Sequence, residues 1–256
     1  HALAPPLFQE LRTSRNRNLI TKEEQKKARS SLIAIAGLSV GNTIAAHLML
    51  EGFENMHLAA YDSLSLSNLN RLRASIADIG VPKTVLAARQ LYEINPYASI
   101  MLFTRGIQTL ADIERFAVQP RRAALIIDEM DSLELKLALR RVAKKNRIAV
   151  VSAADNDTNT VINIERFDQE PSRELYHGVL GDVSTEALRA MAKSEKIAII
   201  NKMVGEKFIT NRMKASLAEV GTTLHTWPQL GGAAAASAAG ICFAAKRIIL
   251  AGDLES

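Results

Sequence analysis

The sequence contains a single cysteine, Cys242, only 5% aromatic residues and no uninterrupted apolar run of the roughly 20 residues that span a bilayer. One cysteine excludes an internal disulfide and suits a reducing compartment, so we expect a cytoplasmic protein without a membrane partner. The excess of positive charge is small, +5 at pH 7. It is compatible with an anionic partner such as a nucleotide or RNA, but ordinary solvated Lys and Arg side chains explain it better, and we expect no nucleic-acid partner.

What the sequence has is enough apolar material for a large core: 48% of its 256 residues. This length suits one large α/β domain, or a domain with an extension. The start at His1 and the ending Gly-Asp-Leu-Glu-Ser are typical of a piece cut from a longer protein. We expect residues 1–8 to be a loose lead-in interrupted by Pro5-Pro6.

Residues 31–83 organise the chain. Leu32–Ala36 is a short apolar run of the length of a buried strand, and the turn Gly37–Asn42 follows it directly. An apolar helical pattern then covers Thr43–Leu50, and a second strand is predicted over Met56–Ala60. Strand, Gly-containing turn and helix together are typical of the opening of a nucleotide-binding βαβ unit.

The alternation of strands and helices continues along the chain. Strands are predicted over residues 100–103, 123–127, 148–152 and 161–167, and helices over residues 21–29, 84–94, 109–116, 132–145, 184–192 and 231–249. This pattern predicts an α/β fold with a Rossmann-like, mostly parallel twisted sheet and helices on both faces, plus a C-terminal extension with additional strands.

Four short motifs follow the strands in a fixed order. Asp62 lies just past the second strand, followed by Ser-Asn-Leu-Asn-Arg ending at Arg71 and by Gly-Val-Pro-Lys ending at Lys83. The fourth strand delivers Asp128-Glu129-Met130-Asp131. This order resembles the ThiF/MoeB/HesA family, bacterial relatives of ubiquitin-activating enzymes. The resemblance covers residues 15–151 well and the remainder loosely; the Gly loop alone would be weak support.

The resemblance implies an adenylyltransferase of the ubiquitin-like modifier-activating type. Such an enzyme binds Mg-ATP and activates a carboxylate as its acyl-adenylate, with release of pyrophosphate. The carboxylate would belong to the C-terminus of a small ubiquitin-like protein, to a peptide or to another acid. Cys242 lies in a small-residue helix, where we expect it to be packed and inert, so no catalytic cysteine is expected.

The resemblance also assigns roles to individual residues. Asn68, Arg71 and Lys83 would contact the ATP phosphates, and Asp131 would hold Mg²⁺ on ATP. Asp131 is equally suited to cap the helix that follows it. The cofactor-binding set is completed by Gly37, Ser39, Gly41 and Asp62, the last of which would contact ribose or metal-bound water.

Arg17 is the expected counterpart of an arginine that, in relatives, reaches ATP in the partner subunit. A guanidinium can bridge two phosphate oxygens there. The resemblance therefore implies a homodimer, with Arg17, Arg71, Lys83 and Asp131 as the catalytic set. The alternative for Arg17 is one exposed arginine among several.

Two departures favour a second hypothesis, a non-catalytic ThiF-like scaffold or partner subunit. Ser39, Val40 and Asn42 replace glycines of the family's Gly-x-Gly-Gly-x-Gly loop, and Val40 would narrow the approach to a phosphate. Ala60 replaces the acid that binds ribose, a loss of about 1–3 kcal/mol. A third hypothesis, a nicotinamide- or flavin-dependent oxidoreductase, is opposed by the missing ribose acid and by the Asn-x-x-Arg and Lys motifs.

Within the single ThiF-type domain, 1–256, we expect an N-terminal arm and helix (1–30), a Rossmann-like core (31–152) and a substrate, crossover and dimerisation extension (153–256). Some relatives are joined to a nitroreductase-like domain, which would fit a piece of a longer protein. The helix over residues 132–145 carries a basic cluster that we expect to be solvated, RNA binding being the alternative. The cluster consists of Lys136, Arg140, Arg141, Lys144 and Lys145.

Overall fold

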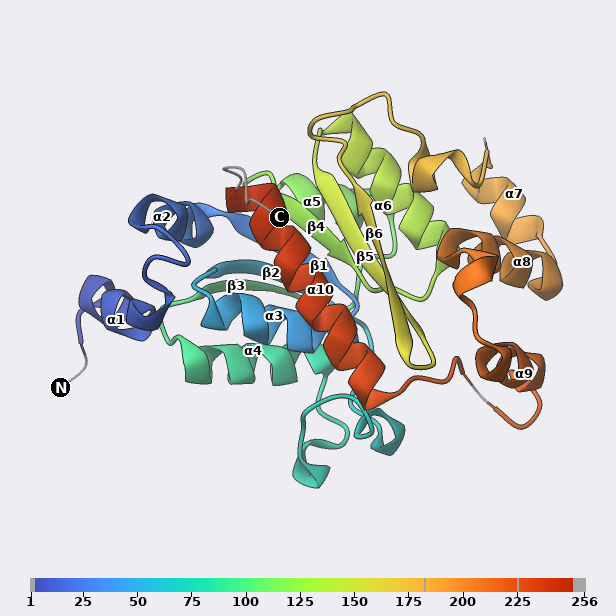
Figure 1. Ribbon diagram of the computed structural model, residues 1–256, viewed down its shortest axis with the longest axis horizontal. Helices are drawn as coiled ribbons and strands as arrows, with labels where there is room; N and C mark the ends of the chain where they lie inside the picture. Colours follow the sequence, from blue (N-terminus) through green and yellow to red (C-terminus); the bar gives the residue numbers. More distant parts are fainter. Residues whose placement is uncertain (1–2, 182, 225, 251–256) are drawn as a thin grey trace.

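The computed structural model describes residues 3–181, 183–224 and 226–250. Its centre is a six-stranded sheet in the order β3-β2-β1-β4-β5-β6 (Figure 1). The strands are β1 (Leu32–Ala36), β2 (Asn55–Ala59), β3 (Ser99–Phe103), β4 (Leu125–Asp128), β5 (Ala149–Asn156) and β6 (Asn159–Glu165). Neighbouring strands from β3 to β5 are parallel, and β6 is antiparallel to β5. The predicted α/β class and Rossmann-like sheet are confirmed.

The two faces of the sheet carry separate cores because successive side chains of a strand point to opposite faces. Ile33 and Ile35 belong to the core formed with helices α3 (Val40–Leu50) and α10 (Gly231–Leu250). Leu32, Ala34 and Ala36 belong to the core formed with α5 (Leu110–Val118) and α6 (Leu133–Lys145). Helices therefore cover both faces, as the pattern predicts.

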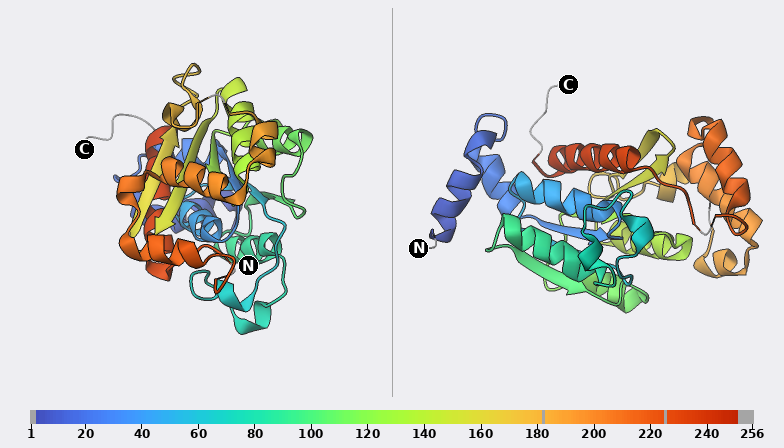
Figure 2. Two further views of the ribbon diagram at one scale, coloured as in Figure 1. Left: turned by 90° about the vertical axis from the view of Figure 1, so that its right-hand side faces the viewer. Right: turned by 90° about the horizontal axis from the view of Figure 1, so that it is seen from below.

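The remaining helices lie along or beyond the sheet. They are α1 (Pro5–Arg12), α2 (Lys22–Ser30), α4 (Lys83–Ile94), α7 (Thr185–Ala190), α8 (Lys193–Val204) and α9 (Asn211–Glu219), with short 3₁₀ turns η1 (Ser14–Asn16), η2 (Leu66–Asn68), η3 (Ile76–Asp78), η4 (Leu175–Gly178) and η5 (Glu206–Phe208). The N-terminal arm and the group α7–α9 lie at opposite ends of the molecule (Figure 2). The extension after β5 thus adds one strand and is otherwise helical.

Among the described helices, α10 is the one whose length and composition would allow it to cross a membrane. Polar residues interrupt its apolar ones, so it does not form an uninterrupted apolar run. In the fold it crosses the sheet diagonally and packs against α3 (Figure 1). Within its most apolar window 56% is buried inside the protein. A core helix of a folded domain satisfies the same test, so this helix is weak support for a membrane span.

Several local predictions are wrong in instructive ways. Of the loose lead-in predicted over residues 1–8, residues 5–8 begin helix α1, because a proline is tolerated in the first turn of a helix; residues 1 and 2 lie outside the described residues. Helix α3 begins three residues before its predicted start, at Val40. Helix α4 begins at Lys83, one residue before its predicted start, with Pro82 as its N-cap. Strand β5, predicted over residues 148–152, continues to Asn156.

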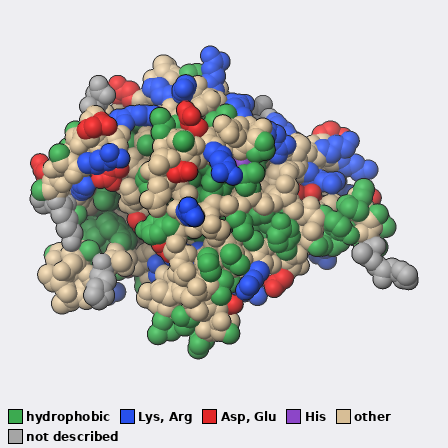
Figure 3. All heavy atoms as spheres, turned by 180° about the vertical axis from the view of Figure 1, so that it is seen from behind, with side chains coloured by type: hydrophobic (Ala, Val, Ile, Leu, Met, Phe, Trp, Pro, Cys, Tyr) green, Lys and Arg blue, Asp and Glu red, His purple; other side chains and the backbone are tan. Residues whose placement is uncertain are grey.

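The surface on the side away from α10 carries side chains of both charges (Figure 3). Acidic and basic side chains are interspersed there, without a single continuous basic patch (Figure 3). The predicted solvated basic face on α6 is, however, partly wrong. Arg140 is completely buried, and Lys136 is paired with a buried aspartate.

Candidate functional site

The carboxyl ends of β1, β2 and β4 meet at one edge of the sheet. The connection after β1 leads to α3 on one face of the sheet, and the connection after β4 leads to α6 on the other face. The strand order therefore reverses between β1 and β4. A crevice at such a switch point is where open α/β sheets bind ligands. Helix α3 begins there with no acidic residue in its first turn and no side-chain cap from Ser39, which favours an anion at its N-terminus.

Gly37 and Gly41 are required by protein packing. Gly37 has φ of +91°, and a Cβ there would overlap the carbonyl oxygen of Glu129. A Cβ on Gly41 would lie 3.0 Å from the Ile35 side chain, between α3 and β1. Val40, expected to narrow the phosphate approach, is instead buried in the core. The altered loop is therefore compatible with an open helix N-terminus.

Arg71 lies against the start of α3. Its Nε donates to Ser39 Oγ at 3.0 Å, and one of its terminal nitrogens donates to Asn70 Oδ1 at 2.9 Å. Burial lowers the pKa of Arg71, and the negative charges of Asp131 and Asp155 oppose that shift. The structure thus brings Ser39, Arg71 and Asp131 into one electrostatic neighbourhood.

Lys83 forms an ion pair with Asp62. Its Nζ lies 2.9 Å from Asp62 Oδ2, and its backbone N–H donates to the Asp62 carbonyl oxygen at 2.9 Å. The lysine side chain is 8% exposed and the aspartate side chain 40%. An ammonium has three donors, so this pair leaves Lys83 able to hold a phosphate oxygen as well.

Asp131 is exposed, and no ion pair joins it to any residue in the described part of the chain. The predicted alternative role as a helix cap is wrong, because Ser132 Oγ accepts the Leu135 N–H and caps α6. The charge of Asp62 raises the pKa of Tyr61, with burial and the charge of Asp131 adding to the shift. Tyr61 is therefore within electrostatic reach of both acids.

Asn68 has a structural role. It is 6% exposed, and its Oδ1 accepts hydrogen bonds from the Ser65 N–H at 3.0 Å and from Ser65 Oγ at 3.1 Å. Its carbonyl oxygen accepts the N–H of Arg71 at 3.1 Å. Asn68 thereby shapes the turn that presents Arg71 to the site.

Arg17 is not brought to this site within one chain. It lies in the N-terminal arm, where its nearest ion-pair partner is Glu10 at 3.8 Å. The arm contacts the far end of α3: Arg12 donates to the Met49 carbonyl oxygen at 2.6 Å. Asn16, the neighbour of Arg17, donates to the carbonyl oxygen of Glu51 at the end of α3, whereas Arg71 contacts Ser39 at its start. Its role across a dimer interface stays a prediction.

Two acids at the site were missed by sequence reasoning. Glu129 accepts the Ala153 N–H at 2.8 Å, and burial raises its pKa to about 8, against the charge of Lys136. Asp155 is 7% exposed and accepts hydrogen bonds from Gln229 and Ser237. Glu129 lies between Asp128 and Asp131 in the sequence, so the motif itself could have identified it. The approach of Asp155 to Arg71 depends instead on how the β5–β6 hairpin packs, which the sequence does not reveal.

The start of α10 completes the wall of the site. Asn70 Nδ2 donates to the Gln229 carbonyl oxygen at 2.8 Å, and a Cβ on Gly231 would lie 2.6 Å from the Asn70 carbonyl oxygen. The Ala60 side chain, directly after β2, offers no acceptor for a ribose hydroxyl. The site therefore has cations and a helix N-terminus for phosphates, but lacks the usual ribose acid.

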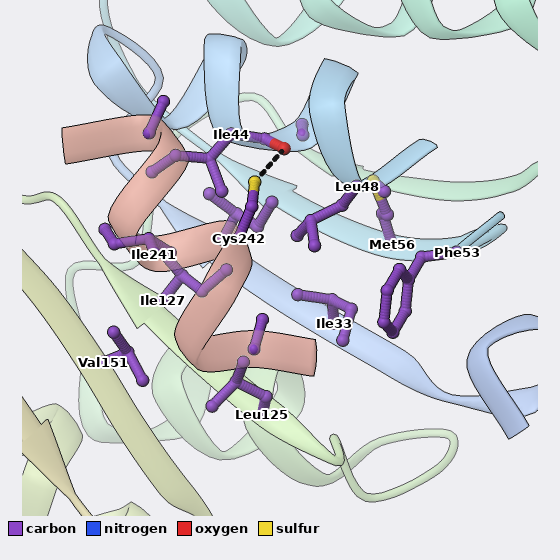
Figure 4. Close-up of a cluster of buried hydrophobic side chains, with 14 of the residues drawn as sticks. Ile33, Ile44, Leu48, Phe53, Met56, Leu125, Ile127, Val151, Ile241 and Cys242 are labelled. Atoms are coloured by element: carbon purple, nitrogen blue, oxygen red, sulfur yellow. Dashed lines mark hydrogen bonds between the residues drawn. The ribbon is translucent and has the colours of Figure 1, made fainter. Parts of the chain in front are cut away.

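Cys242 is remote from this chemistry. It is buried in the core between α10 and α3, and its thiol contacts the Ile44 carbonyl oxygen at 3.7 Å (Figure 4). Burial raises the pKa of the thiol to about 12. The expectation that Cys242 is packed is confirmed.

Comparisons with known proteins identify the family of the chain. The model of the ThiF family matches residues 13–230. An uncharacterized protein of Mycobacterium tuberculosis (strain CDC 1551 / Oshkosh) is 35% identical over 97% of this chain and 34% of its own length. Molybdopterin-synthase adenylyltransferase of Haemophilus influenzae (strain ATCC 51907 / DSM 11121 / KW20 / Rd) is 28% identical over 63% of this chain and 66% of its own length.

Among solved structures, E. coli MccB with ATP superposes with a TM-score of 0.64 at 16% identity, covering 95% of this chain and 65% of that one. This likeness shows the fold alone. The chain spans between about a third and two thirds of the length of the two sequence relatives. From the match to residues 13–230, together with the strand order and the motifs at the sheet edge, the chain belongs to the ThiF family.

Proposed function

We propose that this chain is an ATP-dependent adenylyltransferase domain that activates a carboxylate as its acyl-adenylate. The observation that carries the proposal is the gathering of the α3 N-terminus, Arg71, Lys83 and an unpaired Asp131 at the carboxyl edge of parallel strands. Support also comes from the relative named as a molybdopterin-synthase adenylyltransferase and from the neighbour solved with ATP.

In this proposal the triphosphate lies along the N-terminus of α3. Arg71 and Lys83 neutralise its charge, and the Arg71 side chain is already oriented by Ser39. The reaction then needs positioning and charge stabilisation at the phosphorus under attack, without a protein nucleophile. Cys242 is too deeply buried to supply one, so the mechanism proposed here forms no thioester.

Mg²⁺ fits the donor set as a partner of ATP. Among the described residues no group of three or more His, Cys, Asp or Glu side chains could hold a metal by itself. A hard cation that keeps its waters needs only one or two carboxylates beside phosphate oxygens, and Asp131 is an exposed, unpaired carboxylate at the right edge. Bound there, Mg²⁺ would neutralise charge on the phosphates.

The partners are also part of the proposal. The substrate is a carboxylate-bearing molecule, either the C-terminus of a small ubiquitin-like protein or a peptide. We propose a homodimer, because Arg17 can reach an ATP site only in another copy, and a cytoplasmic location. An associated nitroreductase-like domain is compatible with the extra length of the Mycobacterium relative.

Calorimetric titration with ATP, ADP and NAD, each with Mg²⁺ and with EDTA, tests the function. We expect Mg-dependent ATP binding that Arg71→Ala weakens by about 10- to 100-fold, the worth of hydrogen bonds to a charged group. Arg73→Ala, an exposed arginine two residues away, is the matched control and should change affinity less than twofold.

Ala60 favours one alternative, a ThiF-like scaffold subunit that has lost nucleotide turnover. Absence of binding of any nucleotide would support that alternative. Tighter binding of NAD than of ATP would instead indicate an oxidoreductase.

A further inference from the structure

A completely buried arginine lies behind the turn that carries Asp131. Arg140, on α6, is 0% exposed. Its Nε donates to Glu165 Oε2 at 2.5 Å, one terminal nitrogen donates to Asp128 Oδ2, and the other donates to Ser152 Oγ at 3.1 Å. The guanidinium lies 3.9 Å from the centre of the Tyr176 ring. Four separate segments of the chain thus converge on one cation.

The cluster is balanced in charge. Asp128 and Glu165 are 0% exposed, and Lys136 Nζ lies 3.3 Å from Asp128 Oδ1. Two anions therefore face two cations. Buried ion pairs add little net stability, because desolvation offsets their attraction, and well-packed apolar side chains often do as well. Stability alone is therefore a weak reason for this arrangement.

Asp128 connects the cluster to the proposed metal ligand. It ends β4, and its Oδ1 accepts the N–H of Met130 at 3.1 Å, which fixes the turn leading to Asp131. One carboxylate thus binds Arg140 through one oxygen and the turn through the other. A shift of Arg140 would move or release the Asp128 carboxylate, and with it the backbone that presents Asp131.

Tyr176 connects the cluster to the crossover segment after β6. Its N–H donates to Glu165 Oε1 at 2.7 Å, and its ring covers the guanidinium of Arg140. Tyr176 and His177 both have left-handed backbones, with φ of 49° and 56°. Non-glycine residues hold this conformation only when their surroundings impose it. Tyr176 contacts Arg140 without being part of the turn at Asp128.

We propose that Arg140 is a positioning residue for the nucleotide site, holding the turn from Asp128 to Asp131, and that Tyr176 holds Arg140 in place. This inference rests on the proposed function, because it assigns Asp131 to the metal of Mg-ATP. Residues that orient a metal ligand change metal affinity by about 10- to 100-fold when altered. The effect should therefore appear in the metal dependence of ATP binding more than in binding of ATP itself.

The experiment measures ATP affinity by calorimetry, with EDTA and along a Mg²⁺ series. Arg140→Lys keeps the charge but lacks the planar guanidinium, whose fixed donors hold Asp128, Glu165 and Ser152 together. We expect it to raise the apparent dissociation constant for Mg²⁺ about 10-fold and to change ATP affinity in EDTA less than twofold. Arg141→Lys makes the same chemical change at the next residue, whose guanidinium binds Thr185 and Val183, and should leave both constants within twofold.

Tyr176→Leu removes the ring over Arg140 and alters no charge. We expect the same rise in the apparent dissociation constant for Mg²⁺, with ATP affinity in EDTA nearly unchanged. The titration is made below the melting temperature of that variant. If Arg140→Lys does not fold, the Mg²⁺ dependence of ATP binding by Tyr176→Leu tests the proposal. If the wild-type chain binds Mg-ATP and either folded variant has an unchanged dissociation constant for Mg²⁺, the positioning role is refuted and the proposed function is not. A wild-type chain that binds no ATP overturns the proposed function and this inference with it.

Discussion

Replacement of Lys83 by methionine gives a direct test of the proposed phosphate site. The Lys83 side chain is 8% exposed, and it lies beside the Asp62 side chain, which is 40% exposed. Methionine has a similar length and fills the same space without the charge. The Asp62 carboxylate left behind can still be hydrated, so we expect a loss of about 1 kcal/mol or less in unfolding free energy.

The expected loss of ATP affinity is larger. A hydrogen bond from a charged donor to phosphate contributes about 1.5–3 kcal/mol, and 2 kcal/mol corresponds to a roughly 30-fold rise in the dissociation constant. Calorimetric titration with Mg-ATP measures it, and urea unfolding measures stability in parallel. Lys145→Met, an exposed lysine on α6, is the control for the change in net charge.

Asp62→Asn separates the two partners of the ion pair. If Asp62 only holds Lys83, removing its negative charge should leave ATP affinity unchanged or raise it. Weaker binding would instead indicate that Asp62 contacts ribose or metal-bound water. The reasoning about Lys83 is refuted if Lys83→Met binds ATP like the wild type, or if Lys145→Met loses as much affinity.

Three further predictions concern stability. Gly37→Ala should lower the unfolding free energy by about 3 kcal/mol or more, because the new Cβ would overlap the Glu129 carbonyl. Gly80 has a similar φ of +90° but open space around it, so Gly80→Ala should lower the unfolding free energy by only about 1–2 kcal/mol. Urea unfolding of both variants measures the difference. Tyr176→Phe removes a buried hydroxyl that has no hydrogen-bond partner, so its melting temperature should equal or exceed that of the wild type, and a clear fall would contradict the burial argument. Because burial raises the pKa of Cys242 to about 12, the unfolded chain releases this proton at lower pH than the folded chain, and stability should fall above about pH 9. Cys242→Ala should remove that part of the pH dependence, as measured by unfolding between pH 7 and 11.

Features set by neighbouring residues could be predicted from the sequence. Strand β1 has the predicted bounds Leu32–Ala36, because an apolar run of that length between polar residues has few alternatives. Helix α2 lies within one residue of the predicted range 21–29, because Thr21 and Glu24 cap it through reciprocal hydrogen bonds. The order of the motifs then placed the ligand site at one edge of the sheet. Each of these features depends on chemistry within a few residues.

The errors have the opposite origin. Arg140 was predicted to be solvated, since a charged side chain on a helix usually is, but its carboxylate partners lie 12 and 25 residues away in the chain. Only the packing of β4 and β6 against α6 brings them together. Val40 was predicted to crowd a phosphate because of its position in the loop, yet the early start of α3 turns it into the core.

The sequence by itself therefore determined the order of strands and motifs along the chain, the family and the edge of the sheet that carries the candidate site, because periodicity, caps and motif spacing are local. Only the tertiary structure decided which charges meet. It paired Lys83 with Asp62, placed Asp155 near Arg71 and put Arg17 at the far end of α3. Such encounters depend on how distant segments pack, and no short stretch of sequence contains that information.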